Sequence, residues 1–221
     1  PFVKKGGKVV WADIDFESRV VNVETIKRKI TNKTKAVVVV HLYGYLADMP
    51  EIMQLCADNN LVLIEDCAQS LGTSLDGKRA GTFGDMSIFS HHSQKNISTL
   101  GEGGVLVVKN PEYAQIVPML RHNGHSAYED QEHYWKPAMS NVDFPKLNGN
   151  YIEPNNYCLG EPQCAVGSMI IDRVDEVNSL KRSRAIQFID GLAEFEQLTF
   201  HRVDNERHNY QHLVAFVQND K

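Results

Sequence analysis

Four short apolar runs rich in β-branched residues most constrain how this chain can fold. They lie at residues 35–42 (KAVVVVHL), 61–66 (LVLIED), 85–90 and 104–109. The first is nearly continuous, which is typical of a strand buried on both faces of a sheet. Helices are expected at 48–59, with Pro50 in the first turn where its missing N–H costs nothing, and at 111–122. Strands that alternate with helices at this spacing predict an α/β fold with a mostly parallel sheet.

The remaining segments suggest how the chain is organised. We expect a strand at 9–14, a helix at 23–30 capped by Asn22, and a long helix from Gly160 to about Phe195 that breaks near Asp190–Gly191. The runs LTFHRV and HLVAFVQ are expected to be the opening strands of a second domain. The chain starts at Pro1 and enters the first expected strand almost at once, so we expect an internal piece of a longer protein.

Composition excludes several classes of function. A net charge of -5 over 221 residues provides no basic footprint for nucleic acid. No apolar run reaches the length of about eighteen residues that a membrane span needs. The 4 cysteines are scattered without a CxxC pair, which favours reduced thiols in a cytoplasmic protein over a disulfide framework.

Three polar residues fall at the ends of expected strands. Ligands of parallel α/β sheets bind beyond the carboxyl ends of the strands, and His41, Asp66 and Ser90 lie at such ends. The Asp66 carboxylate can pair with a protonated ring nitrogen, or it can equally cap a helix or form a loop salt bridge. Gln69 can hydrogen-bond a phenolic oxygen on that ring or support a capping arrangement. We expect His41 to stack on a flat ring, although it can instead merely fill a strand end.

Lys95 lies in a loop, FSHHSQKNISTLGEGG, that ends in glycines. A lysine taken alone is most often a surface residue. Here Ser90 and Ser93 precede it and GEGG follows, so hydroxyls and backbone N–H groups suited to a phosphate are close in sequence. A lysine amine in this setting can hold a carbonyl cofactor as a Schiff base. Together with Asp66 and Gln69, Lys95 predicts a site for pyridoxal 5'-phosphate.

Two further features leave their roles open. His91 and His92 are adjacent on a strand and point to opposite faces, so we expect no metal site. Residues 123–155 lack periodicity, and an insertion of that length is usually functional or disordered. It can bind a polar, anionic substrate or another subunit, or it can be a folded surface excursion with solvated charges. Its aromatic and basic residues are His125, Tyr128, His133, Tyr134, Trp135 and Lys136.

Five stretches together resemble the DegT/DnrJ/EryC1/StrS family of sugar aminotransferases, from about Gly7 to about Arg184. They are KAVVVVHLYG, LVLIEDCAQS, GTFGDMSIFS, QKNISTLGEGG and NNYCLGEPQCAVG. The resemblance implies an aspartate-aminotransferase-like, pyridoxal-phosphate-binding large domain whose sheet carries helices on both faces. It assigns residues 1–195 to that domain, without its N-terminal part, and residues 196–221 to the beginning of a small α+β C-terminal domain.

The resemblance also implies roles for individual residues. Lys95 is similar to the Schiff-base lysine, and Asp66 to the partner of the pyridine nitrogen. Gln69 matches the contact to the ring hydroxyl, and Ser90 matches a phosphate ligand. Asn156 matches the asparagine that reaches the phosphate of the neighbouring subunit's cofactor, which implies a homodimer with shared active sites.

The implied activity is transfer of an amino group, from glutamate, to a keto or aldehyde sugar. A sub-branch of the family has histidine in place of the lysine and dehydrates its substrate, so Lys95 favours transamination. WKPAMSNVDFP, followed by PNNYCLGEPQCA, is most similar to the branch that aminates carbon 8 of an oxidised octulosonate, a lipopolysaccharide sugar. Cys158 stands where the family has arginine, and His91 where it has an aromatic residue. The alternatives are a pyridoxal-phosphate-dependent sugar dehydratase and a non-catalytic, truncated chain that binds a sugar or a partner.

Overall fold

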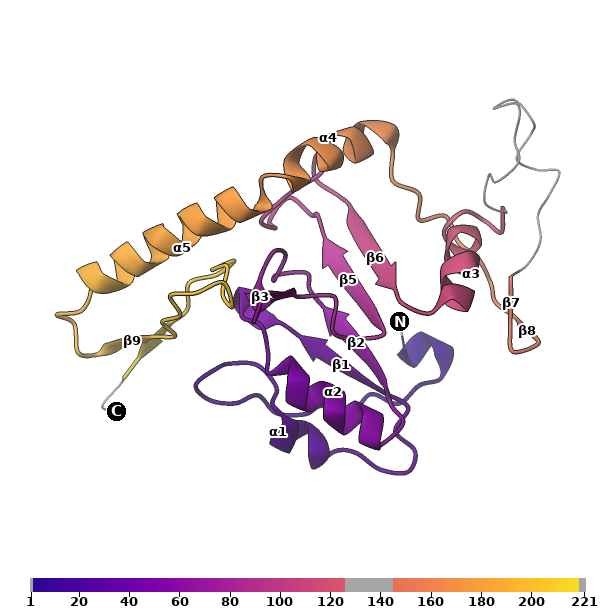
Figure 1. Ribbon diagram of the computed structural model, residues 1–221, viewed down its shortest axis with the longest axis horizontal. Helices are drawn as coiled ribbons and strands as arrows, with labels where there is room; N and C mark the ends of the chain where they lie inside the picture. The colour runs from indigo at the N-terminus through magenta and orange to yellow at the C-terminus, as the bar shows by residue number, and fades with distance from the viewer. Residues whose placement is uncertain (1, 126–144, 219–221) are drawn as a thin grey trace. The chain divides into compact units, whose positions relative to one another are not determined.

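The computed structural model describes residues 2–125 and 145–218 (Figure 1). The described chain divides into two compact units, one made of Pro1–Val107 with Ala165–Lys221 and the other of Val108–Cys164. Each is described by itself.

The first unit is built on a sheet of four strands in the order β1-β2-β5-β6. Their bounds are Ala36–Val40 for β1, Val62–Asp66 for β2, Met86–Ser90 for β5 and Gly104–Val108 for β6. β2 pairs in parallel with β1 on one side and with β5 on the other. The arrow of β6 points the opposite way to that of β5 (Figure 1). All four strands were expected from the apolar runs, and the mostly parallel α/β sheet is confirmed.

Two helices cover one face of this sheet. α1 (Val23–Lys27) begins with a capping box, in which Asn22 and Thr25 each accept the other's backbone N–H. α2 (Met49–Asp58) follows Asp48 and has a proline in its first turn, as expected. The core between helices and sheet contains Val37, Val39, Leu46, Ala47, Met49, Ile52, Cys56, Leu63 and Cys67. On the opposite face Val38, Val40, Val62 and Ile88 stay exposed, so β1 is buried on one face of the described structure and not on both.

The N-terminal segment differs from expectation. After the short 3-10 helix η1 (Val3–Lys5), residues 7–15 form neither helix nor strand. The strand expected at 9–14 is therefore wrong. Val9, Val10 and Trp11 are exposed, and among the described residues they have no neighbouring strand to pair with. A second 3-10 helix, η2 (Leu42–Gly44), follows β1, and β3 (Ser74–Leu75) pairs with β4 (Lys78–Arg79) after β2.

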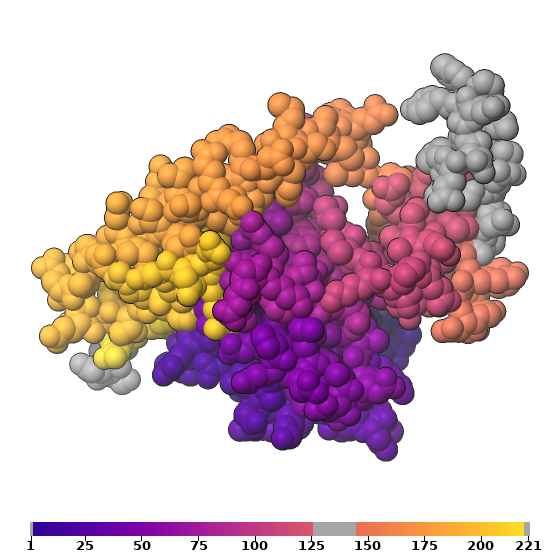
Figure 2. All heavy atoms as spheres, viewed as in Figure 1, coloured from indigo at the N-terminus to yellow at the C-terminus, as the bar shows by residue number. Residues whose placement is uncertain are grey.

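The long helical stretch is two helices, α4 (Glu161–Ile171) and α5 (Val174–Gly191). The break at Asp172–Arg173 was not expected, whereas α5 does end at Gly191, where the break was expected. β9 (Leu198–Phe200) and β10 (Ala215–Val217) then pair antiparallel, so both C-terminal strands are confirmed. Ala185 and Ile189 of α5 pack against Tyr210, and Figure 2 shows the orange atoms of α5 against the yellow atoms of the C-terminal segment. The domain boundary expected at residue 196 stays a prediction.

The second unit holds α3 (Pro111–Arg121), β7 (Lys146–Leu147) and β8 (Asn150–Tyr151). Asn110 caps α3, because its side chain accepts the N–H of Glu112 at 2.8 Å. β7 and β8 form a small antiparallel hairpin. Roles in binding a substrate or another subunit were considered for five residues that lie outside the described part of the chain: Tyr128, His133, Tyr134, Trp135 and Lys136. None of the helices described in either unit is both long and apolar enough to cross a membrane.

Candidate functional site

The parallel strands bring three of the expected site residues to one edge of the sheet. In register, Val40 of β1 lies opposite Asp66, and Asp66 lies opposite Ile88 of β5. His41 therefore follows the end of β1, Asp66 ends β2, and Ser90 ends β5. This is the edge at which open α/β sheets bind ligands.

Asp66 has one carboxylate oxygen engaged and one available. Its Oδ1 accepts the backbone N–H of Ala68 at 3.0 Å, which turns the chain away from the strand. Its backbone carbonyl accepts the N–H of His41 at 3.1 Å. Oδ2 has no hydrogen-bond partner among the described residues, so it can accept a hydrogen bond from a ligand.

Gln69 connects the loop after β2 to the loop after β1. Its Oε1 accepts the N–H of Tyr43 at 2.6 Å. The side-chain NH₂ group has no partner within the described part of the chain, so its two N–H donors remain available for a ligand oxygen. Gln69 thus combines a fixed side chain with a free donor.

Asn209 holds these same loops from the C-terminal segment. It is fully buried, and its Nδ2 donates to the carbonyls of Gln69 at 2.9 Å and Leu71 at 3.2 Å. Its backbone N–H donates to the carbonyl of Gly44 at 3.1 Å. Sequence reasoning missed Asn209, because the contact spans 140 residues and leaves no local pattern.

The Lys95 loop is closed by hydrogen bonds within its own backbone. The N–H of Lys95 donates to the carbonyl of His92 at 2.9 Å, and that of Ser93 to Gly101 at 2.9 Å. A Cβ at Gly103 would lie 2.1 Å from Thr99 Oγ1. Close packing therefore requires glycine at this position of the GEGG run. The Lys95 ammonium group has no hydrogen-bond or ion-pair partner among residues 2–125 and 145–218.

Ser90 is half-buried at the start of this loop. Its Oγ accepts the N–H of His92 at 3.4 Å, a long hydrogen bond that leaves the hydroxyl hydrogen free to donate. This is the donor that a phosphate contact at Ser90 requires.

His41 and Glu65 form a fully buried pair behind the strand ends. His41 Nε2 lies 3.1 Å from Glu65 Oε2, and His41 Nδ1 accepts the N–H of Ala47 at 3.3 Å. The expected stacking of His41 on a flat ring gains no support from this geometry, because the side chain has no exposed surface and both ring nitrogens are engaged. His41 fills a strand end, which was the other interpretation.

Glu65 is the charged residue that sequence reasoning missed. Its Oε1 accepts the N–H groups of Phe83 at 2.8 Å and Gly84 at 2.6 Å, and its Oε2 that of Gly81 at 2.8 Å. Burial by itself raises the pKa of this carboxyl, but the hydrogen bonds from His41, Gly84 and Gly81 outweigh burial and hold the pKa below its ordinary value. The ionised Glu65 therefore ties the residue before Asp66 to the loop 81–84.

Cys67 completes a group of potential metal ligands with His41 and Glu65, whose ligand atoms lie within 4.8 Å of one another. Burial raises the pKa of the Cys67 thiol far above its ordinary value, so the thiol is protonated. The Glu65 oxygens already accept hydrogen bonds, as described above. A neutral thiol and an occupied carboxylate fit a packed hydrogen-bond network better than a metal site.

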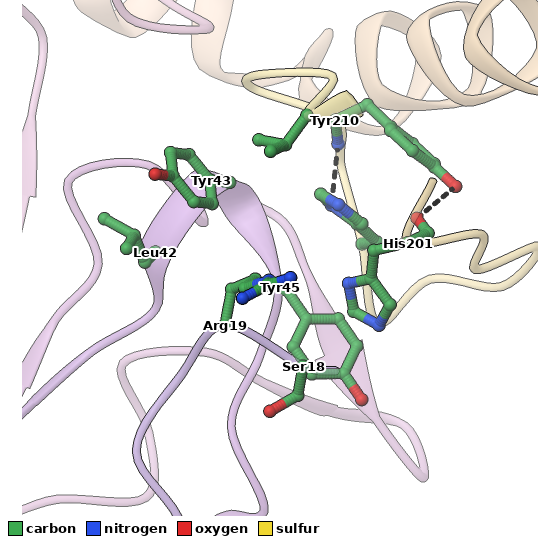
Figure 3. A pocket seen from close by; sticks show the side chains of 9 residues that line it. Ser18, Arg19, Leu42, Tyr43, Tyr45, His201 and Tyr210 are labelled. Carbon is green, nitrogen blue, oxygen red and sulfur yellow. Dashed lines mark hydrogen bonds between the residues drawn. The ribbon is translucent and has the colours of Figure 1, made fainter. Parts of the chain in front are cut away.

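A small cavity lies where the C-terminal segment contacts the N-terminal half (Figure 3). Its lining includes Arg19, Tyr45, His201, His208 and Tyr210. The Tyr210 N–H donates to His208 Nδ1 at 3.0 Å, and the two rings stack with centroids 4.0 Å apart. Burial, helped by nearby His201, lowers the pKa of His208 to about 3. Leu42 and Tyr43 also line this cavity, but none of the residues expected to bind the cofactor does.

Asn156 belongs to the second unit. It bridges to His122, and its Oδ1 accepts the N–H of Cys158 at 3.2 Å. Cys158 is exposed, and its thiol lies 3.8 Å from the carbonyl oxygen of Arg121.

Comparison with known proteins places this site in context. The model of the DegT/DnrJ/EryC1/StrS aminotransferase family matches residues 1–221. A GDP-perosamine synthase of Vibrio cholerae is 35% identical over 208 residues, which are 94% of this chain and 52% of that protein. The X-ray structure of an aminotransferase from Psychrobacter cryohalolentis superposes with a TM-score of 0.81 at 28% identity, covering 99% of this chain and 56% of the other.

A third similar structure is a GDP-4-keto-6-deoxymannose-3-dehydratase with a trapped PLP-glutamate geminal diamine. It has a TM-score of 0.81 and 25% identity, and the match covers 99% of this chain and 56% of that one. The chain thus spans about half the length of the relatives and structures it matches.

Proposed function

Because the chain belongs to the DegT/DnrJ/EryC1/StrS aminotransferase family, we propose that the full-length protein is a pyridoxal-phosphate-dependent sugar aminotransferase. It moves an amino group, from glutamate, to a keto or aldehyde sugar. The observation that carries the proposal is the Lys95 ammonium group, unpartnered among the described residues, in the loop that follows β5 at the same edge of the sheet as Asp66.

The free groups at this edge fit the cofactor. Lys95 offers an amine for its carbonyl, Asp66 Oδ2 an acceptor for a protonated ring nitrogen, and Gln69 Nε2 a donor for the ring hydroxyl. Ser90 offers a hydroxyl for the phosphate. Each of these groups is left available by hydrogen bonds that fix the rest of the residue.

The reaction needs a group that takes up electrons and a base that moves a proton. Pyridoxal phosphate, when bound, supplies the electron sink. Asp66 keeps a positive charge on the ring nitrogen, because its carboxylate stabilises the protonated form. Lys95 would hold the carbonyl of the cofactor, and its amine, when neutral, would accept the substrate proton on Nζ and return it. Glu65 and His41 hold the backbone from which Asp66 projects.

The partner and the substrate branch are finer parts of the proposal. We propose a homodimer in which Asn156 reaches the phosphate of the neighbouring subunit's cofactor, as the family motif implies. We also propose 8-oxo-octulosonate, a precursor for lipopolysaccharide, as the sugar. The support is the segment 135–145, most of which lies outside the described residues, and Cys158 in place of the family's arginine.

Sugar dehydration is the competing function, favoured by the similarity to a GDP-4-keto-6-deoxymannose-3-dehydratase. Lys95 favours transamination, because the dehydrating sub-branch has histidine at this position. The two reactions differ in the fate of the glutamate nitrogen. A transaminase leaves it on the sugar as an amine, whereas a dehydratase that replaces a hydroxyl by hydrogen takes two electrons from glutamate and releases the nitrogen as ammonia.

The test is to incubate the full-length protein with pyridoxal phosphate, L-glutamate and a small panel of keto sugars that includes 8-oxo-octulosonate and GDP-4-keto-6-deoxymannose. We expect 2-oxoglutarate and amino sugar in equal amounts with one panel member. Lys95→Ala should keep the circular-dichroism spectrum and lose turnover, while Lys33→Ala, at an exposed lysine, should keep both. Normal turnover by Lys95→Ala would refute the proposal, and a deoxy sugar without nitrogen, formed together with ammonia, would favour the dehydratase.

A further inference from the structure

Side chains from a distant part of the chain hold the residues on both sides of Lys95. Before it, the carbonyl of Gln94 accepts a hydrogen bond from Gln211 Nε2 at 2.7 Å. After it, Asn96 Nδ2 donates to Asn178 Oδ1 at 3.1 Å, and Asn96 Oδ1 accepts from the Lys181 ammonium group. In each of these contacts, the two partners are separated by 82 to 117 positions in the sequence.

Asn178 extends this network to the loop that carries Gln69. It is buried, with 3% of its surface exposed, and its Nδ2 donates to the carbonyl of Leu71 at 2.9 Å. A Cβ at Gly72 would lie 2.5 Å from the same Nδ2, so the loop approaches α5 closely. Asn178 and Lys181 are three residues apart on α5 and share a face. One face of α5 therefore contacts the two loops that hold Gln69 and Lys95.

Lys181 has an unusual electrostatic setting. It is half-buried, and its hydrogen bond among the described residues is to a neutral amide, with no carboxylate of the described chain in ion-pair contact. Burial lowers the pKa of Lys181. A partly desolvated ammonium group without a counter-charge is costly, so simple packing does not account for a lysine here.

We propose that Lys181 is a positioning residue for the Lys95 loop, acting with Asn178 through Asn96. It fixes the backbone on one side of Lys95, as Gln211 does on the other, and leaves the Lys95 amine free to react with the carbonyl of the cofactor. A reactive group needs such support, because small displacements of its backbone misplace its atoms. This inference rests on the function proposed for Lys95.

The test compares Lys181→Met, which removes the donor and the charge, with Lys181→Arg, which keeps both. Arg184→Ala, at an exposed position of α5, is the matched control. The apo full-length proteins are titrated with pyridoxal phosphate, and the visible band reports binding. Thermal unfolding is compared in parallel. We expect Lys181→Met to raise the apparent Kd about tenfold. We expect Lys181→Arg to restore most of the affinity and Arg184→Ala to leave the Kd unchanged.

An unchanged Kd in folded Lys181→Met would overturn the inference while leaving the proposed function intact. A weaker Kd that arginine does not rescue would also overturn it, since that is the result of structural damage alone. Wild-type protein that gains no visible band with pyridoxal phosphate would instead refute the proposed function. If thermal unfolding shows that Lys181→Met does not fold, Gln211→Ala, which frees the other side of Lys95, must raise the Kd about tenfold or the inference fails.

Discussion

The substitution Glu65→Gln tests the buried network behind the site. Glu65 is fully buried, and its two oxygens accept three backbone N–H groups. Its Oε2 also lies 3.1 Å from His41 Nε2. A glutamine has one acceptor oxygen, so if that oxygen serves Phe83 and Gly84, the new NH₂ group faces the donors on Gly81 and His41. His41 cannot simply reverse its ring proton, because Nδ1 accepts the N–H of Ala47.

The expected loss follows from this count. Two hydrogen bonds to a charged acceptor become donor–donor contacts, and each costs about 1.5–3 kcal/mol. We therefore expect Glu65→Gln to lower the free energy of unfolding by about 3–6 kcal/mol, a large part of the roughly 5–15 kcal/mol by which a typical protein is stable. Because the pKa of Glu65 is lowered on folding, its contribution is present above the unfolded pKa and is lost as the pH falls below about 4.5.

Urea unfolding at pH 7, followed by circular dichroism, measures this change in the free energy of unfolding. Glu17→Gln, at an exposed glutamate, is the matched control and should change the free energy by less than about 0.5 kcal/mol. A loss below about 1 kcal/mol for Glu65→Gln, with the control unchanged, would refute the reasoning. It would mean that the carboxylate does not need its charge or its four partners.

Two further predictions concern stability. His208 has a pKa of about 3 in the folded protein, so the unfolded state binds more protons as the pH falls below 6.5, and stability must fall with it. Between pH 7 and pH 5 this lowers the free energy of unfolding by about 2 kcal/mol. In urea titrations, the free energy of unfolding of His208→Phe should therefore depend less steeply on pH than that of the wild type. An equal slope in both proteins would contradict the prediction. Gly44 has φ +93, and a Cβ there would lie 1.8 Å from Asn209 Oδ1, whereas Gly77 has φ +76 with nothing within 4 Å. Thermal unfolding should therefore show Gly44→Ala to be more destabilising than Gly77→Ala by about 1–3 kcal/mol, the cost of overpacking alone, and equal losses would disprove this contact.

The sequence predicted the elements whose signals are local. The four apolar runs became strands, Asn22 caps α1, and Asp66 ends a strand beside β1 and β5. These features depend on β-branched runs, capping side chains and strand order, each of which is visible within a few residues.

Contacts between distant residues could not be predicted in this way. The pair of His41 with Glu65 spans 24 residues, and that of Lys181 with Asn96 spans 85. The break between α4 and α5 falls at Asp172–Arg173, where no glycine or proline marks the end of a helix in the sequence. The apolar residues at 9–14 resembled a strand, but a strand also needs a partner, and hydrophobicity alone does not supply one.

The central claim is that Lys95 binds pyridoxal phosphate covalently, and borohydride reduction followed by peptide mass mapping tests it most directly. The full-length protein is loaded with pyridoxal phosphate, reduced and digested. The account predicts a yellow protein whose fixed pyridoxyl mass lies on the peptide that contains Lys95. A protein that stays colourless and unlabelled with added cofactor, or a label confined to other lysines, would contradict it.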